Sequence, residues 1–141
     1  MVLDQAKMKP GNTTIVVGIG CRKGVSTAEV RAAIDAAFAG DACAERGPGL
    51  LAAPDAKQNE QGILGAAAAL GLRLMWISQT ALEAAGARAR TNSARSMAAM
   101  NVGSVAEASA LAAAGPNARL LVERLAVGPV TCALAQSENC P

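Results

Sequence analysis

The apolar positions of the chain fall into two patterns, short continuous runs and runs with helical spacing. Residues 13–19 form a continuous run rich in β-branched side chains, which is typical of a strand buried on both faces. Shorter runs at residues 50–53 and 72–78 predict two further strands. The first of these should end at Pro54 or lie at a sheet edge, because proline has no N–H group to donate to a neighbouring strand.

Helical spacing marks the segments between these strands. A serine followed three residues later by a glutamate is a capping box, and Ser26–Glu29 and Ser104–Glu107 both place one before an apolar-periodic segment. Glycine follows the longer periodic segments, at Gly40, Gly71 and Gly115, where it can end a helix. The pattern therefore predicts helices over residues 26–40, 80–84 and 104–115, and another that starts at Asn59 or Gln61 and runs to residue 70.

The C-terminal part of the chain predicts a pair of strands. Residues 118–127 and 130–136 are apolar runs joined by the dipeptide "GP", so they should pair antiparallel. The alternation of strands and helices before them predicts an α/β fold with three layers, α/β/α. Its sheet should be mixed and mostly parallel, with about five strands and residues 13–19 at its centre. We expect a mobile tail at residues 1–12, a single domain at 13–141, and an irregular segment at 91–102.

Composition removes several functions. Aromatic residues make up 1% of the 141 residues, so the platforms on which nucleic-acid bases stack are lacking in the sequence. The formal net charge is +2 and no basic block stands out, which gives no support to a role at nucleic acid or at a membrane surface. Histidine is absent, which excludes a Ser-His-Asp or Cys-His mechanism within the chain. We expect neither a nucleic-acid nor a membrane partner.

The four cysteines are too sparse for a disulfide framework. None of Cys21, Cys43, Cys132 and Cys140 has the two-residue spacing of a zinc ribbon or a thioredoxin motif. We expect reduced, mostly buried thiols, with no disulfide, no bound metal and no cofactor. The N-terminal residues lack the apolar core of a signal peptide, and no stretch approaches the roughly 20 apolar residues of a membrane span. A cytoplasmic protein is the prediction.

The candidate chemistry is concentrated in the turn after the first strand, "GIGCRKG". Its three glycines, Gly18, Gly20 and Gly24, are expected to permit positive φ or close backbone approach. Amides at the start of the next helix favour an anion, and Arg22 and Lys23 add positive charge beside them. Three interpretations stay open: a tight turn without a ligand, a phosphate loop, and a site where Cys21 has a lowered pKa and acts as a nucleophile. The spacing G-x-G-x-x-x-G is one residue longer than the dinucleotide fingerprint.

A second polar segment, "DAKQNE", follows the second predicted strand. It contains Asp55, Lys57 and Glu60, and its lysine can pair either with a ligand carboxylate or only with these two acidic neighbours. Ligands of open α/β sheets bind at the carboxyl ends of the strands, where this segment and the first turn both lie. We therefore group the two segments as one candidate site.

Together, these segments resemble one family. "GIGCRKG", "DAKQNE" followed by "GILGAAAALGL", "GSVAEASALAAAG" and a closing "TCALA" are similar to the CobE and CbiG C-terminal domain family of cobalamin biosynthesis, from residue 15 to about residue 135. The resemblance implies a three-layer α/β domain that handles precorrin-type tetrapyrroles. In CbiG the domain follows others, and the whole protein opens a δ-lactone on a cobalt-bound, ring-contracted precorrin and releases acetaldehyde. A stand-alone domain resembles CobE, and other corrin-pathway enzymes are its implied partners.

The resemblance also implies which residues contact the tetrapyrrole. The positions that match the family's motifs are Gly18, Gly20, Cys21, Arg22, Gly24, Asp55, Lys57, Glu60, Ser104, Glu107, Ala108 and Thr131. The chain departs from the family pattern at Pro54, where an unbroken strand is usual. It also has Arg124 and Gln136 at positions where a lysine and a basic residue, respectively, are common.

These lines of reasoning lead to one interpretation of the turn. Precorrins have acetate and propionate arms, and a glycine-rich anion nest with Arg22, Lys23 and Lys57 suits such arms. We therefore predict a carboxylate-binding turn, with the protein acting as a carrier or as an enzyme on the lactone intermediate. One cleft should be lined by Gly20, Cys21, Arg22, Lys57 and Glu107. A nucleotide- or phosphate-binding module and a non-catalytic partner subunit remain as alternatives, and Ser104 with Glu107 can equally do no more than cap a helix.

Overall fold

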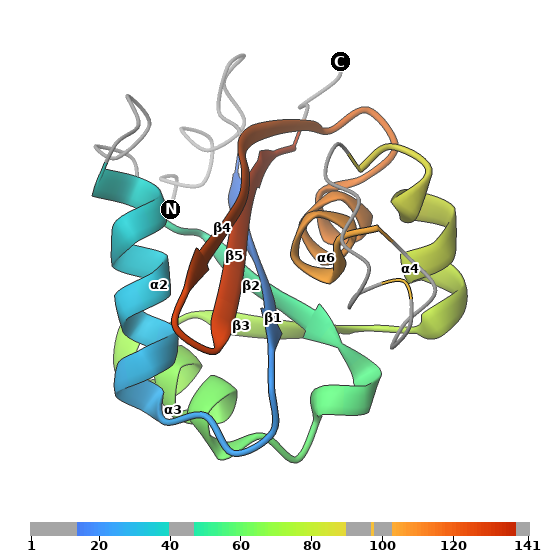
Figure 1. Cartoon of the computed structure of the whole chain (residues 1–141). Coiled ribbons are helices and arrows are strands. Elements are labelled where there is room, and N and C mark those ends of the chain that lie inside the picture. Colours follow the sequence, from blue (N-terminus) through green and yellow to red (C-terminus); the bar gives the residue numbers. More distant parts are fainter. Residues whose placement is uncertain (1–13, 40–46, 90–96, 98–102, 138–141) are drawn as a thin grey trace, which may run out of the picture.

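The computed structural model describes residues 14–39, 47–89, 97 and 103–137 (Figure 1). The predicted tail at 1–12, the segment at 91–102 apart from Met97, and Cys43 and Cys140 lie outside the described residues. In chain order the elements are β1 (Ile15–Cys21), α2 (Thr27–Ala39), β2 (Leu50–Pro54), the short 3-10 helix η2 (Asp55–Lys57), α3 (Gln61–Leu70), β3 (Arg73–Ile77), α4 (Gln79–Gly86), α6 (Val105–Ala114), β4 (Arg119–Val127) and β5 (Val130–Gln136).

The sheet has five strands in the order β3-β2-β1-β5-β4. The β1–β2 and β2–β3 pairs are parallel, whereas β5 is antiparallel to both β1 and β4. Four strands therefore run in one direction and only β5 runs in the other. The predicted mixed, mostly parallel sheet and the central position of the first strand are both confirmed.

Helices cover both faces of this sheet, which confirms the three-layer α/β/α prediction (Figure 1). The α2 and α3 helices lie on one face, while α4 and α6 lie on the other. Successive β1 residues alternate between these faces, as the pleat of a strand requires. Ile15, Val17 and Ile19 pack in the core cluster under α2 and α3, and Val16 packs in the cluster under α6.

The local signals for helix ends proved accurate in the described residues. Before α2, Ser26 N donates to Glu29 Oε1 at 2.9 Å, and Glu29 N donates to Ser26 Oγ at 3.0 Å, which is a complete capping box. Gly71 closes α3 in the left-handed conformation with φ of 69°. The short helix expected at residues 80–84 is longer than predicted, because Ser78 caps it and α4 begins at Gln79.

The second predicted capping box is only half confirmed. Ser104 caps α6 as expected, since its Oγ accepts from Glu107 N at 3.2 Å. The Glu107 carboxylate is used elsewhere, because its Oε2 accepts from Arg124 N on β4 at 2.8 Å. Every residue from Val105 to Leu111 is buried, so a glutamate in the first turn of α6 faces the sheet rather than solvent.

Among the described residues, none of the helices combines the length and the apolar character that crossing a membrane requires.

Candidate functional site

The two polar segments singled out in the sequence meet at the carboxyl edge of the sheet. Because β1 and β2 are parallel neighbours, the turn after β1 and the η2 segment after β2 begin at the same edge. A hydrogen bond links them directly, since Gly24 N donates to Glu60 Oε1 at 2.9 Å. Arg22 N donates to Pro129 O at 3.1 Å, which ties the same turn to the β4–β5 hairpin. The two segments therefore lie next to each other at this edge, as expected for turns that follow parallel neighbouring strands.

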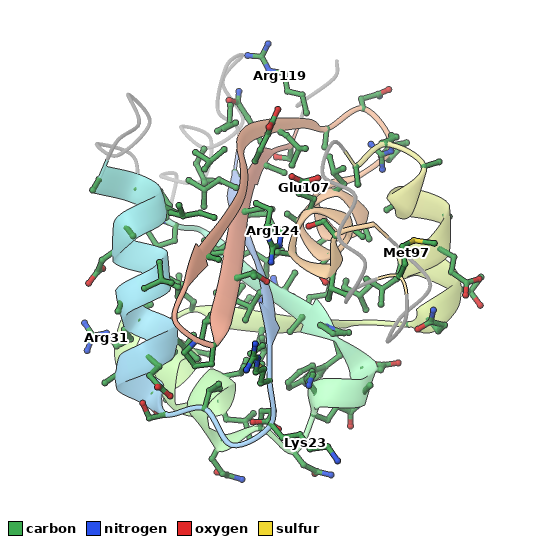
Figure 2. All side chains as sticks on the ribbon, in the orientation of Figure 1. Lys23, Arg31, Met97, Glu107, Arg119 and Arg124 are labelled. Carbon is green, nitrogen blue, oxygen red and sulfur yellow. The ribbon has the colours of Figure 1, made fainter. Side chains whose placement is uncertain are left out.

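Charge at this edge is divided between carboxylates that are hydrogen-bonded and cations that have no partner among the described residues. Asp55 accepts from Gln58 Nε2 at 3.2 Å, and Glu60 accepts from the turn. The side chains of Arg22 and Lys23 are exposed, and that of Lys57 is half-buried. Within the described part of the chain, none of these three cationic groups has a hydrogen bond or an ion pair. Figure 2 shows Lys23 at the outer end of this edge.

Three backbone amides of the turn are not open to the anion that the sequence predicted there. The amides at Arg22, Gly24 and Ser26 already donate to protein oxygens. Gly24 has φ of 79°, a conformation that favours glycine and shapes the turn. These three amides are therefore not open to a carboxylate, and the cationic side chains of this edge are the groups best suited to hold one.

The other two glycines of the motif lie inside the sheet. Gly18 and Gly20 are buried residues of β1, and neither has positive φ. A Cβ atom added to Gly18 would overlap Ala106 O and lie 2.7 Å from Ala110 N. A Cβ atom added to Gly20 would lie 2.7 Å from Oγ1 of Thr131. The geometry gives no support to ligand contact at these two positions, because α6 and Thr131 occupy the space that the missing side chains leave.

Thr131 and Ser104 both serve this packing of α6 on the sheet. Thr131 Oγ1 donates to Gly20 O at 3.2 Å, which adds a side-chain hydrogen bond to the backbone hydrogen bonds between β5 and β1. Ser104 is fully buried and caps α6. Neither side chain lies in the group of cations beyond the end of β1, so their proposed contact with a tetrapyrrole has no direct support in the geometry.

The predicted single cleft is split by the sheet. Gly20 faces α6, whereas Cys21, the next residue of β1, packs with the cluster under α2 and α3. Glu107 is fully buried on the α6 side. Arg22 and Lys57 lie beyond the end of the strands. The five residues therefore do not line one surface, because neighbouring strand residues point to opposite faces.

Cys21 does not have the lowered pKa of a nucleophilic thiol. Burial raises its pKa from the usual 9.0 to about 11, with a smaller lowering effect from Lys57 and a smaller raising effect from Glu60. The thiol is therefore protonated at neutral pH, which disfavours the hypothesis of an activated cysteine. Cys132 is buried and its pKa is raised to about 12, also by burial. Both are free thiols.

This protonation state predicts slow alkylation. At pH 8 the folded protein should react with iodoacetamide at Cys21 about a hundredfold more slowly than a thiol of ordinary pKa, because only the thiolate attacks. The rate should rise steeply as the pH approaches 11. Peptide mass spectrometry reads each cysteine separately, and the same chain in denaturant is the control. Equal rates at Cys21 in the folded and denatured chain at pH 8 would contradict the buried, protonated thiol.

The sign of the linked stability effect follows from the same pKa. An unfolded thiol ionises near 9.0, whereas folded Cys21 stays protonated up to about 11. Its contribution to stability is complete below pH 9 and is lost as the pH rises from 9 to 11. Alkaline conditions should therefore destabilise the fold.

Two further features of the described residues bear on possible sites. No group of three or more His, Cys, Asp or Glu side chains within the described ranges could hold a metal ion. An open cavity of about 240 Å³ lies between α4 and α6, lined mainly by alanines and by Arg88. The Arg88 guanidinium is already bonded to the last carbonyls of α6 and the following turn, at 3.3–3.5 Å. The cavity contains none of the predicted site residues.

Sequence reasoning gave no role to Arg124. Its amide bonds to Glu107, and its side chain is half-buried on β4. The only sequence signal was the departure from lysine at this position, because the contact joins residues 17 positions apart on different elements.

Comparison with known proteins gives consistent matches. The family described as "Cobalamin synthesis G C-terminus" matches residues 15–135. Protein CobE of Sinorhizobium sp is 32% identical over 121 residues, which make up 86% of this chain and 79% of that protein. The crystal structure of CobE, a protein from the cobalamin biosynthetic pathway, superposes with a TM-score of 0.79 at 29% identity, over 91% of this chain and 93% of that one. The crystal structure of the cobalamin biosynthesis protein chiG from Agrobacterium tumefaciens gives a TM-score of 0.65 at 38% identity, over 86% and 97% of the two chains.

Proposed function

This chain belongs to the family of the cobalamin synthesis G C-terminus, and from that premise we propose that it binds a precorrin-type tetrapyrrole at the carboxyl edge of its sheet. In this role it is a carrier between enzymes of corrin synthesis, or an enzyme that acts on the ring-contracted lactone intermediate. A carrier would also contact the enzymes from which it receives the tetrapyrrole and to which it delivers it.

The observation that carries the proposal is the group of three cations beyond β1 and β2. Arg22, Lys23 and Lys57 gather where two parallel strands end, the usual ligand-binding edge of such sheets. The carboxylates of the same edge are engaged in hydrogen bonds within the protein, at Asp55 and Glu60. The cations are therefore available to the acetate and propionate arms of a tetrapyrrole, for which arginine offers a planar pair of donors.

The alternatives fit this edge less well. A nucleotide or phosphate loop binds its anion through backbone amides, and the amides of Arg22, Gly24 and Ser26 are occupied by protein acceptors. Chemistry by a Cys21 thiolate is disfavoured by the raised pKa of that thiol. Binding of a polycarboxylate by side chains needs only the cationic groups of Arg22, Lys23 and Lys57.

A titration with cobyrinic acid, a stable corrin polycarboxylate, tests the proposal. The visible absorption of the corrin should change in a saturable way, and the emission of Trp76, one residue before the carboxyl end of β3, should be quenched. ATP and the methyl ester of cobyrinic acid, which lacks the free carboxylates, are the controls and should bind far more weakly. A Kd for cobyrinic acid weaker than about 1 mM, or one no tighter than that of the ester, would overturn the proposed function.

Mass spectrometry of the corrin separates the carrier from the enzyme. After incubation of the protein with the ring-contracted lactone intermediate, a carrier returns it with unchanged mass. An enzyme that opens the lactone takes up one water and then releases acetaldehyde, so it returns a product lighter by the mass of acetaldehyde less that of water. Incubation of the intermediate without protein is the control.

A further inference from the structure

The β4 strand has two register shifts against β5, between Leu120 and Val122 and between Val122 and Leu125, and the second one contains Arg124. Val122 pairs with Leu134 and Leu125 pairs with Cys132, so two residues of β4, Glu123 and Arg124, lie opposite a single residue of β5. Such a β-bulge disrupts the ladder locally, bends the strand and redirects a side chain. A backbone amide released from the ladder needs another acceptor when it is not open to solvent.

Glu107 supplies that acceptor. It is fully buried in the first turn of α6, and its Oε2 accepts from Arg124 N at 2.8 Å. Burying a carboxylate is costly unless it receives hydrogen bonds, and a bond of this length to a charged oxygen is strong. Glu107 is therefore placed to hold the bulge against α6, and being fully buried it is not placed to meet a ligand.

The bulge determines where the Arg124 side chain goes. Leu125 and Val127 pack in the cluster under α2 and α3, so alternation along the strand directs Arg124 to the α6 face. Figure 2 shows its side chain extending from the β4–β5 hairpin toward α6. The side chain is half-buried, and its guanidinium makes no hydrogen bond or ion pair with other described residues.

We propose that Glu107 is a positioning residue that holds the β4 bulge, and that the bulge presents the Arg124 guanidinium beside the first turn of α6 as a second carboxylate-binding point. This inference rests on the proposed function, because the bound group would be another acidic arm of the same tetrapyrrole. The first point consists of the cations after β1 and β2, and the second lies on the α6 face. Two separated points match a large ring with acidic arms around its rim better than a small anion.

Titration of variants with cobyrinic acid tests the inference. Arg124→Ala should weaken binding about tenfold or more, as expected for loss of a charge-assisted bond to a carboxylate, and Arg124→Lys should restore most of it. Arg31→Ala removes the same charge from the exposed side of α2, away from α6, and should leave the affinity unchanged (Figure 2). The methyl ester should bind the parent and Arg124→Ala equally weakly.

A double-mutant cycle tests the positioning role. Glu107→Ala removes the acceptor, so it should weaken binding about as much as Arg124→Ala, and the double variant should lose no more than either single one. Glu107→Gln keeps an oxygen for Arg124 N and should bind nearly as the parent does. If Glu107→Ala does not fold, the Glu107→Gln and Arg124→Lys titrations still decide the matter.

The outcomes separate this inference from the proposed function. Parent binding with an unchanged Kd in Arg124→Ala overturns the second binding point and leaves the proposed function standing. Additive losses in the double variant, or a large loss in Glu107→Gln, overturn the positioning role. Failure of the parent to bind cobyrinic acid overturns both.

Discussion

Replacing Gly18 by alanine is expected to lower the free energy of unfolding by about 3 kcal/mol or more, which is the upper range for overpacking of a tight core. The added Cβ would overlap Ala106 O and approach Ala110 N to 2.7 Å. Both are backbone atoms of α6, so the overlap can be removed only if the whole helix shifts away from β1. The movement would disturb the buried contacts of α6 with β1 and β5.

Urea unfolding followed by circular dichroism measures this effect. Gly24→Ala is the matched control, because that glycine belongs to the same motif but an added Cβ would have no neighbour within 4 Å. Its cost should come only from φ of 79° and amount to about 1–2 kcal/mol. Surface substitutions usually change the free energy of unfolding by no more than about 0.5 kcal/mol. A change this small for Gly18→Ala would show that α6 does not occupy the space beside Gly18.

The second large effect concerns ligand binding. The triple variant Arg22→Ala, Lys23→Ala and Lys57→Ala should bind cobyrinic acid about a hundredfold more weakly than the parent. A charge-assisted hydrogen bond contributes about 1.5–3 kcal/mol, but exposed ion pairs contribute about 0.2–1 kcal/mol. Arg22 and Lys23 are exposed and Lys57 is half-buried, so each should contribute between these two ranges. We expect the three side chains together to contribute about 3 kcal/mol of binding free energy, which converts to about a hundredfold in Kd.

A charge-matched triple variant controls for long-range attraction. Arg31→Ala, Arg73→Ala and Arg119→Ala remove the same number of positive charges away from the carboxyl edge. Arg73 and Arg119 begin their strands, and Figure 2 shows Arg119 at the opposite end of the molecule from Lys23. This control should lose affinity only slightly, and the loss should vanish in salt, which screens distant charges. Equal losses in the two triple variants would show that net charge, not a site, attracts the corrin.

Local sequence signals predicted most of the fold. The continuous apolar run after residue 13 identified the central strand, and Ser26 with Glu29 identified the start of α2. Gly71 identified the end of α3. Each of these features depends on residues within a few positions of one another, so periodicity and capping chemistry were sufficient to locate them. The meeting of "GIGCRKG" and "DAKQNE" followed from topology, because parallel neighbouring strands end at one edge.

The contacts that individual residues of the two candidate motifs make could not be predicted in the same way. The glycines at 18 and 20 suggested ligand contact, but whether that space receives a ligand or a helix depends on α6, which lies far along the chain. The turn amides looked available for an anion until folding brought Glu60 to Gly24. The two neighbouring cations left a lowered pKa of Cys21 as one open interpretation, but burial under α2 and α3 dominates and raises the pKa.

The sequence by itself determined the order of strands and helices, the family, and the segments that carry charge, because these are encoded in short stretches of residues. Only the tertiary structure decided which of those residues face outward. Glu107 resembled a simple capping residue, yet the β4 bulge provided an amide for its carboxylate. Arg124 was thereby turned toward α6 (Figure 2). Such assignments depend on the packing of elements distant in sequence, where burial and unpaired backbone groups determine which hydrogen bonds form.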